Sequence, residues 1–464
     1  MKHRLVVASL IVIAFLSSCK KNDLSSENIA PPTTTPTTPS GTTADALKDS
    51  ALLYAKDIYL WYNQIPTSFN ARSYDDLNKL MTALRQYSNE PGFAGSADRW
   101  SFAVKKDQWD NVSTGVAVGD FGLNVFFRAE GDLRVKLVER ESPAGLAGVR
   151  RGWRITAING NSNITTGNAD FIVKNIYEST ASSITFQKPD NSSVTLNLNA
   201  GLYNEHAVVF DSIYNIDTKK IGYFSFNSFL GDTTEIYNEF HRIFNGFAAA
   251  NVSDVIIDLR YNGGGYVSVQ QKMANWLAPS SANGQLMMKQ MFNDKYTQYN
   301  SNELFSKLGS LNLSRIFFIV SSSTASASEL LINNLKPYLD VKLLGPSKTY
   351  GKPVGYFPIP VGDWYIFPVS FRSTNKAGEG NYFGGIPVNN QVADGLDKDW
   401  GDVNESSLKS ALSYITNGSF RGAAAGTRGT STSIYQEQPE VKTGNTILDK
   451  PSFKGTIDTR KFRN

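Results

Sequence analysis

Residues 255–265 read Val-Ile-Ile-Asp-Leu-Arg-Tyr-Asn-Gly-Gly-Gly, so an apolar run ends in three consecutive glycines. The run has the length and composition of a buried strand. Glycines adopt backbone conformations that are closed to other residues, and they let a second chain come close to the main chain. The stretch therefore predicts a buried strand that ends in a tight turn with an accessible backbone.

Strand-like and helix-like segments alternate around this turn. An apolar run at 221–226 predicts another strand. Helical periodicity begins at Thr234, recurs at 267–277 and begins again near Ser326. Buried strands that alternate with helices indicate an α/β layer structure, which we assign to residues 203–418.

The stretch Thr324-Ala-Ser-Ala-Ser-Glu329 lies between a strand-like run at 316–320 and the helix that begins near Ser326. A serine at a strand-to-helix junction exposes its hydroxyl while the N–H groups that follow it point toward a developing oxyanion. Ser326 is therefore a candidate nucleophile. The alternative is a helix capping box, in which Ser326 and Glu329 each bond to the other's backbone and no chemistry is needed.

A serine hydroxyl is a weak nucleophile unless a base takes its proton, and histidine is the commonest base. Of the three histidines in the chain, His3 lies in a predicted leader and His241 lies on the polar side of an amphipathic helix. His206 stays open as a candidate. The loop 345–353 contains Lys352. A lone lysine in a polar loop is usually a solvated surface charge, so only its neighbours can give Lys352 a catalytic role.

Together, the glycine turn, the serine junction and the lysine loop resemble peptidase family S41, the carboxyl-terminal processing or tail-specific proteases. Gly384-Gly-Ile-Pro387 is similar to a late segment of that family. The resemblance extends from Ala46 to about Gly418. It implies a multidomain α+β protein whose α/β peptidase domain is of the ClpP/crotonase-like type. It also implies a serine endopeptidase that cleaves polypeptides near their C-termini without a metal or cofactor.

The resemblance assigns roles to single residues. Ser326 matches the nucleophile of the family, and Lys352 matches its general base. The oxyanion hole matches the backbone N–H of Ala327 together with that of one glycine of the turn, Gly265 or else Gly264. The implied reaction is amide hydrolysis through an acyl-enzyme.

A lysine base must be neutral near pH 7. Lowering its pKa from about 10.4 to about 7–8 requires that the charged form be destabilised by roughly 4 kcal/mol. Burial without a carboxylate partner could supply this free energy, so we expect Lys352 to be desolvated and within reach of Ser326 when substrate is bound. Many family members carry a glutamine four residues after the lysine. Tyr356 stands there, so Tyr356 is only a possible orienting partner.

Between residues 111 and 202 the pattern changes to short β-like runs separated by turns. Three of its segments, Phe121-Gly-Leu-Asn124, Ser142-Pro-Ala144 and Gly152 to Gly160, resemble a PDZ domain in order and spacing. The loop that matches Phe121, Gly122, Leu123 and Asn124 offers N–H groups to the terminal carboxylate of a peptide in PDZ domains. The alternative is a PDZ-like module that serves only as a spacer.

The N-terminal residues predict export and anchoring. Residues 1–18 have the charged start and short apolar run of a secretory leader. Leu16-Ser-Ser-Cys19 resembles the bacterial lipobox, in which the cysteine is lipidated, and Lys20 resembles outer-membrane sorting. We therefore expect an extracytoplasmic lipoprotein of the outer membrane, on a face left undecided. The Ser/Thr/Pro-rich residues 19–45 predict a disordered tether.

The remaining assignments are a small helical domain at 46–110 and a loose tail at 419–464. Ser73 with Asp76 opens the second helix of the helical domain. The formal net charge of +4 gives no electrostatic case for nucleic acid. We expect polypeptide substrates, a membrane contact through the anchor and no nucleic acid, and the oligomeric state stays open. Two rivals are a catalytically inactive, lipid-anchored peptide-binding scaffold and a module for a non-peptide ligand, suggested by the 12% aromatic content.

Overall fold

The computed structural model describes residues 43–420, 442–443, 446–447 and 453–459. They belong to one compact unit, Gly41–Asn464. The predicted leader 1–18, Cys19 and most of the tether 19–45 lie outside the described residues. Within the described ranges, no helix is both long and apolar enough to cross a membrane.

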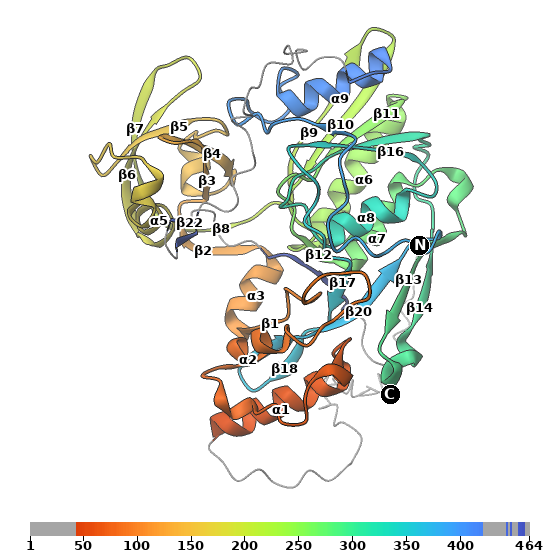
Figure 1. Cartoon of the computed structure of the whole chain (residues 1–464). Coiled ribbons are helices and arrows are strands. Elements are labelled where there is room, and N and C mark those ends of the chain that lie inside the picture. The colour runs from red at the N-terminus through yellow and green to blue at the C-terminus, as the bar shows by residue number, and fades with distance from the viewer. Residues whose placement is uncertain (1–42, 421–441, 444–445, 448–452, 460–464) are drawn as a thin grey trace, which may run out of the picture. The chain divides into compact units, whose positions relative to one another are not determined.

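A sheet of six strands forms the centre of the α/β region (Figure 1). In sheet order the strands are β21 (Asn390–Gln391), β16 (Asp340–Gly345), β15 (Arg315–Ile319), β11 (Asp254–Asp258), β10 (Lys219–Phe226) and β9 (Val208–Ile216). All neighbours pair in parallel except β9, which is antiparallel to β10. The strands predicted at 221–226, 255–259 and 316–320 are confirmed as β10, β11 and β15.

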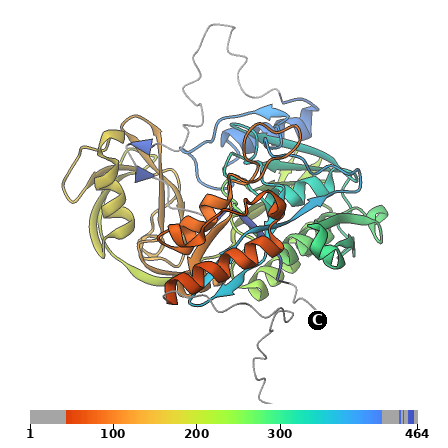
Figure 2. The same cartoon turned by 60° about the horizontal axis from the view of Figure 1, so that its bottom comes forward.

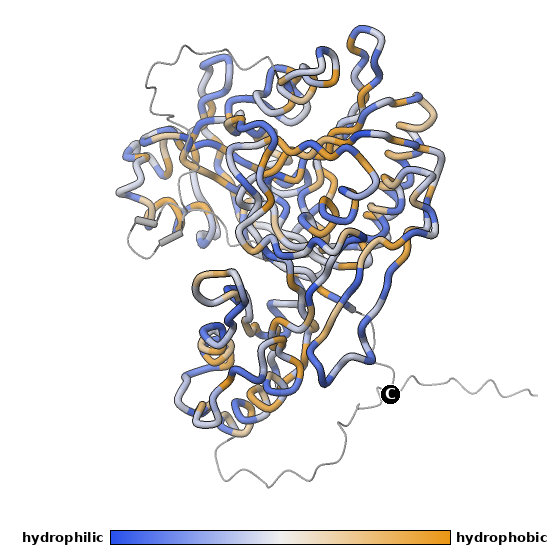
Figure 3. Tube along the Cα trace, turned by 45° about the vertical axis from the view of Figure 1, so that its right-hand side comes forward, coloured by the Kyte–Doolittle hydropathy of each residue, from blue (hydrophilic) through white to orange (hydrophobic). Residues whose placement is uncertain are grey.

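Helices cover both faces of this sheet. One face packs against α6 (Thr233–Ala249), α7 (Val267–Leu277) and α8 (Ala327–Leu335), and the other packs against α9 (Ser406–Asn417). Val255 and Ile257 of β11 belong to the first hydrophobic cluster, while Ile256 between them belongs to the second. Side chains of a strand point alternately to its two faces, so an unbroken apolar run is required here. Figure 3 shows these hydrophobic segments in the interior of the region.

A second six-stranded sheet meets the first at the glycine turn. Its order is β12 (Gly264–Tyr266), β24 (Gly455–Ile457), β17 (Val354–Tyr356), β20 (Val369–Thr374), β13 (Leu286–Phe292) and β14 (Ser301–Leu304). Strand β24 comes from the C-terminal segment and pairs in parallel with β12 and β17. The prediction of a loose tail at 419–464 is therefore wrong for residues 453–459. A three-residue strand has no readable periodicity, and its partners lie far away in the sequence.

The N-terminal residues do not form a helical domain with a core of its own. Helices α1 (Thr43–Ile58), α2 (Leu77–Leu84) and α3 (Lys106–Thr114) form, and Asp76 caps α2 by accepting from Lys79 N–H at 2.7 Å. Strand β1 (Phe102–Lys105), however, pairs with β19 (Trp364–Phe367), which pairs with β18 (Ile359–Val361). The N-terminal residues and the strands β18 and β19 share one hydrophobic cluster. Helix α1 lies at the front of the molecule in Figure 2. Helical periodicity identifies an apolar face but not the surface that covers it.

Residues of the expected PDZ-like module form an antiparallel sheet with its own hydrophobic cluster. The strands, in order, are β3 (Leu123–Ala129), β4 (Asp132–Val138), β5 (Arg154–Ile158), β6 (Ala181–Gln187) and β7 (Ser193–Asn199). Two short helices, α4 (Pro143–Leu146) and α5 (Ala169–Val173), accompany them. The entering strand β2 (Val116–Asp120) pairs with the leaving strand β8 (Gly201–Asn204), so the two connections of the module lie side by side. A small hairpin, β22 (Lys442–Thr443) and β23 (Thr446–Ile447), completes the described strands.

Candidate active site

Ser326 immediately precedes α8 and has an uncommon backbone conformation. Its φ is +60° and its ψ is −108°, and its side chain is fully buried. A non-glycine residue in such a region costs about 1–3 kcal/mol, so the surrounding structure must hold it there. The Ser326 N–H donates to Glu329 Oε2 at 2.8 Å, which is the Glu329 half of the capping box. The hydroxyl of Ser326 shares a hydrogen bond with Thr456 Oγ1 of the C-terminal segment.

Two backbone N–H groups face the space beside Ser326. Ala327 is the first residue of α8, where N–H groups have no partner inside the helix and the helix dipole favours negative charge. Gly264 and Gly265 have φ values of +105° and +143°, which glycine tolerates best. A Cβ on Gly264 would lie 2.9 Å from Ala327 N and 2.4 Å from the Gly455 carbonyl oxygen. Only glycine leaves this space open.

The two glycines differ in what their N–H groups do. Gly264 N–H donates to Asn262 Oδ1 at 2.9 Å. Gly455 N–H donates to the Gly263 carbonyl at 3.0 Å, and in a parallel pair of this register the Gly265 N–H faces the Gly455 carbonyl. Of the two glycines matched to an oxyanion hole, Gly265 thus presents its N–H to a peptide carbonyl, while Gly264 has a structural partner.

Asn262 fixes the glycine turn to the serine junction, and the sequence analysis gave it no role. Its side chain is buried and also donates to the Phe226 carbonyl at 3.0 Å. Its own carbonyl accepts from Ala325 N–H and from Ser328 Oγ, both at 3.0 Å. One polar residue therefore sets the distance between the two backbone segments that carry the candidate donors.

Lys352 is buried, with 1% of its surface exposed. Burial lowers the pKa of Lys352 well below the usual range for a lysine, although the charges of Asp98 and Glu329 act in the opposite direction. Its Nζ donates to the Lys454 carbonyl at 3.0 Å. The interpretation of Lys352 as a solvated surface lysine is therefore wrong. Its amine is held in a site that favours the neutral form.

Tyr356 meets Lys352 with the face of its ring. The Lys352 Nζ lies 3.5 Å from the centre of that ring and 5.7 Å from the centre of the Trp100 ring. The Tyr356 hydroxyl points elsewhere and donates to the Trp100 carbonyl at 3.0 Å. Tyr356 thus shields the amine and fixes its place, but it offers the amine no hydrogen-bonding group.

Glu329 joins the serine junction to the lysine loop. Its Oε2 accepts from Ser326 N–H and Lys352 N–H, both at 2.8 Å, and its Oε1 accepts from Gly351 N–H at 2.6 Å and Thr349 Oγ1 at 2.5 Å. Burial raises the pKa of Glu329, and these four bonds partly oppose the shift. From the sequence alone, Glu329 is only a candidate helix cap. The signal that could have found it is its place three residues after the candidate nucleophile.

Strand β24 and the residue before it contact both candidate catalytic side chains. Ser326 Oγ shares a hydrogen bond with Thr456 Oγ1, and Lys352 Nζ is bonded to the carbonyl of Lys454. The structure therefore brings Ser326, Lys352, Gly265 and Ala327 to one place, along one strand.

Comparison with known proteins identifies the region that carries this site. Residues 220–381 match the model of peptidase family S41. These residues belong to peptidase family S41. They include the glycine turn, the serine junction and the lysine loop, so the family assignment supports a peptidase. No curated protein sequence matches the chain.

A solved structure agrees with this chain at the level of the fold, and two others have lower similarity. A Bacteroides fragilis protein described as an S41 protease is 22% identical, with a TM-score of 0.63 over 79% of this chain and 97% of that chain. The photosystem II D1 C-terminal processing protease is 18% identical, with a TM-score of 0.46 over 76% of this chain and 93% of that chain. Mature CPAF in complex with lactacystin is 11% identical, with a TM-score of 0.41 over 75% and 93%.

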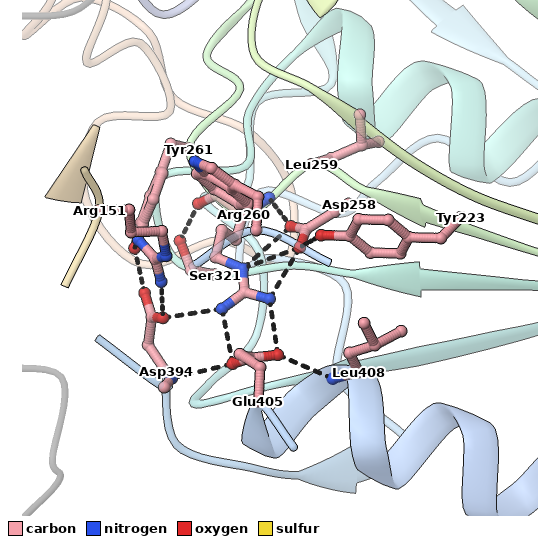
Figure 4. A network of polar contacts seen from close by, with 12 residues as sticks. Arg151, Tyr223, Asp258, Leu259, Arg260, Tyr261, Ser321, Asp394, Glu405 and Leu408 are labelled. Atoms are coloured by element: carbon pink, nitrogen blue, oxygen red, sulfur yellow. Dashed lines mark hydrogen bonds and ion pairs between the residues drawn. The ribbon is translucent and has the colours of Figure 1, made fainter. Parts of the chain in front are cut away.

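A buried ion network lies behind the glycine turn of the S41 region (Figure 4). Arg260 pairs with Asp258 and Asp394 at 2.7 Å and with Glu405 at 3.0 Å, and Arg151 of the expected PDZ-like module pairs with Asp394 at 2.6 Å. Although burial acts to raise it, the pKa of Asp394 is lowered to about 2 by the charges of Arg151 and Arg260. The network anchors the strand end from which the turn begins.

The histidines of the described chain have other partners. His206 lies between Glu235 and Glu141, at 2.6 and 3.0 Å, and His241 packs its ring edge against Trp276. Neither histidine contacts Ser326 in the part of the chain that the structure describes. In the same residues no group of three or more His, Cys, Asp or Glu side chains is arranged to hold a metal ion.

The loop 121–124 of the expected PDZ-like module lies near the S41 site. Gly122, Leu123 and Asn124 line a cavity of about 420 Å³ together with Gly263 and Gly264. The Phe121 side chain, by contrast, is fully buried in the core of the module, and Gly122 N–H donates to Asp120 Oδ1 at 2.8 Å. The Gly122 N–H, which was expected to bind the terminal carboxylate of a peptide, is thus already hydrogen-bonded to the Asp120 carboxylate.

Proposed function

We propose that this S41 protein is a serine endopeptidase that cleaves polypeptides through an acyl-enzyme, with Ser326 as the nucleophile and Lys352 as the general base. The observation that carries the proposal is the burial of Lys352, which favours the neutral amine beside a serine junction. A neutral amine can accept the proton of a serine hydroxyl, whereas a solvated ammonium cannot.

The proposed reaction has two steps. Ser326 Oγ attacks the peptide carbonyl carbon, and Lys352 Nζ takes the hydroxyl proton and gives it to the leaving amine as the C–N bond breaks. Water then attacks the acyl-enzyme ester, with Lys352 again accepting a proton and returning it to Ser326. The N–H groups of Ala327 and Gly265 stabilise the oxyanion in both steps. Glu329 and Asn262 hold these groups in place.

The test uses protein that lacks residues 1–22 and compares how fast its variants cleave an unfolded polypeptide. Ser326→Ala and Lys352→Ala should each reduce kcat/KM by about 10³-fold or more, because nucleophile and base act as a unit. Lys348→Ala is the matched control, since Lys348 is exposed in the same loop. If Ser326→Ala leaves cleavage unchanged, the mechanism is wrong.

The second candidate function is a catalytically inactive, lipid-anchored scaffold that binds peptides. The observation in its favour is that a peptide strand already lies across Ser326, while Tyr356 offers Lys352 no hydrogen-bonding group. A scaffold would bind unfolded polypeptides with equal affinity in the wild type and in Ser326→Ala, and neither protein would release new termini.

We propose cleavage near the C-termini of substrates, with the PDZ-like module binding an extended segment next to the active site. The cavity shared by Asn124 and Gly264 supports the second part. Because Asp120 occupies Gly122 N–H, a terminal carboxylate can bind there only if the Asp120 side chain moves. Proteomic comparison of protein C-termini in cells with wild-type protein and with Ser326→Ala tests this specificity: internal cuts alone would refute it.

We propose that Cys19 carries a lipid and anchors the protein in the outer membrane. The proposal rests on the lipobox-like residues 16–19 and the Ser/Thr/Pro-rich stretch after them. Cells grown with labelled palmitate should label the wild type but not Cys19→Ala, and Cys19→Ala should leave the membrane fraction. Membrane association that persists in Cys19→Ala would contradict it.

A further inference from the structure

We infer that residues 453–458 occupy the position of a substrate strand in the active site, so that the chain's own C-terminal segment competes with polypeptide substrates. This inference rests on the proposed function for the meaning of the site. It adds which segment occupies the active site, how that segment is aligned with the glycine turn, and how it would regulate cleavage. The segment contacts Ser326, Lys352 and the glycine turn, all of which have a role in the proposed mechanism.

The backbone pairing is that of an added strand. Strand β24 lies between β12 and β17 and is parallel to both. Gly455 N–H donates to the Gly263 carbonyl at 3.0 Å, and Asp458 N–H donates to the Tyr356 carbonyl at 3.1 Å. Backbone bonds to an exposed strand are how many proteins bind extended peptides regardless of sequence. Any unfolded chain could make the same bonds.

The register places a peptide carbonyl where the oxyanion would form. The Gly455 carbonyl faces the Gly265 N–H, and both this carbonyl oxygen and Ala327 N lie within 3 Å of the point at which a Gly264 Cβ would stand. The peptide bond that follows Gly455 thus corresponds to the bond that would be cut in a substrate. The next residue, Thr456, is 4% exposed and contacts the nucleophile.

The same segment also engages the two side chains to which the proposed mechanism assigns the chemistry. Ser326 Oγ is hydrogen-bonded to Thr456 Oγ1, and Lys352 Nζ donates to the Lys454 carbonyl. The Ser326 hydroxyl and one N–H of the Lys352 amine are thus both engaged by residues of the segment. The occupied site is therefore blocked, and it becomes competent only when β24 leaves or is replaced.

Side chains of the segment hold it in this position. Phe453 packs its ring against Trp109, at 5.2 Å between centres, and against Phe102, at 6.2 Å. Ile457 is 1% exposed in the hydrophobic cluster that these aromatic residues share. A Cβ on Gly455 would lie 2.1 Å from the Phe453 ring, so the register requires glycine or a shift of that ring. An attached segment competes at an effective concentration in the millimolar range.

The test replaces Gly455 in the full chain. Gly455→Pro removes the N–H that bonds to Gly263 and adds atoms beside Phe453, so it should release β24. Thr459→Pro is the matched control, because Thr459 is exposed and lies beyond β24. We expect Gly455→Pro to raise kcat/KM for an unfolded polypeptide by about tenfold or more, and Thr459→Pro to leave it unchanged. Equal activity of the wild type and Gly455→Pro overturns the inference.

A binding measurement separates this inference from the proposed function. A fluorescent peptide with the sequence of residues 453–459 should bind the double variant Gly455→Pro, Ser326→Ala at least tenfold more tightly than it binds Ser326→Ala. If the peptide binds in this way but Gly455→Pro cleaves nothing, the peptidase proposal fails and the strand assignment stands. If Gly455→Pro is active yet the peptide binds both proteins equally, the strand assignment fails.

Hydrogen exchange covers the case in which Gly455→Pro does not fold. In full-length Ser326→Ala, the amides of Gly455 and Asp458 should be protected. Saturation with an unfolded polypeptide should increase their exchange, because the polypeptide takes the place of β24. Protection that is unchanged at saturation, with the polypeptide bound, would show that β24 is a permanent strand of the sheet and would overturn the inference.

Discussion

Glu329→Gln tests whether one buried carboxylate positions both the nucleophile and the base. Each carboxylate oxygen accepts two hydrogen bonds, so an amide in its place leaves two buried donors without an acceptor. Each such donor costs about 1–3 kcal/mol, which predicts a loss of about 2–6 kcal/mol in the free energy of unfolding. Displacement of Ser326 or Lys352 by about 1 Å should also lower kcat by about 10²-fold.

The charge of Glu329 gives a second readout that a purely structural residue would not affect. The negative charge of Glu329 raises the pKa of Lys352, so its removal should lower that pKa further. The acid limb of the pH profile of kcat/KM should therefore move to lower pH in Glu329→Gln. Urea unfolding would give the stability change, and cleavage of an unfolded polypeptide from pH 5 to pH 10 would give the profile.

The matched control is Glu239→Gln. Glu239 forms an ion pair with Arg242 at the surface of α6, and such pairs contribute about 0–1 kcal/mol. It should leave both readouts close to the wild type. The reasoning is refuted if Glu329→Gln, like Glu239→Gln, unfolds at the wild-type urea concentration and keeps the wild-type pH profile.

Four further predictions concern the neighbouring groups. Lys352→Arg should abolish cleavage at every pH, whereas wild-type kcat/KM should rise with pH through the lowered pKa of Lys352; activity of Lys352→Arg would exclude the base role. Arg260→Met leaves buried carboxylates unpaired and should lower the free energy of unfolding by about 3–5 kcal/mol, as calorimetry can show. In the wild type, Asp394 contributes to the free energy of unfolding above pH 4, and this contribution is lost as the pH falls toward its pKa of about 2. An acid titration in which the ionisation of Asp394 lowers the free energy of unfolding would contradict this prediction. Gly264→Ala should reduce kcat by about 10²-fold because its Cβ meets Ala327 N, while Gly378→Ala, with similar φ strain but open space, should cleave normally.

Patterns along the chain predicted the elements whose own residues determine them. The unbroken apolar run ahead of the glycine turn gave strand β11, and helical periodicity gave α7 with the bounds that the structure has. The left-handed backbone at Ser326 and the burial of Lys352 could not be derived from local pattern, because both depend on contacts between distant loops. The sequence resemblance pointed to these two residues without giving their geometry.

Local sequence patterns do not reveal a residue's role where that role depends on a distant partner. Glu329 fits a capping box by spacing alone, and nothing in that spacing indicates that its carboxylate also binds the backbone of Lys352. Residues 455–457 are too few to show a period, so a strand there depends on a vacant position between β12 and β17. The N-terminal helices show their apolar faces in the sequence, but the cluster that covers them includes residues near Val361.

The contacts around Lys352 also set an order in time. Trp100 and Tyr356, whose side chains enclose the amine, are 256 positions apart in the chain, and Arg99 donates to the Gly351 carbonyl at 3.2 Å. Long-range contacts of this kind form late in folding. Until they form, Lys352 is a hydrated, protonated lysine with an ordinary pKa. A partly folded chain therefore lacks the proposed base, and the proposed mechanism requires that the first and last thirds of the polypeptide have met.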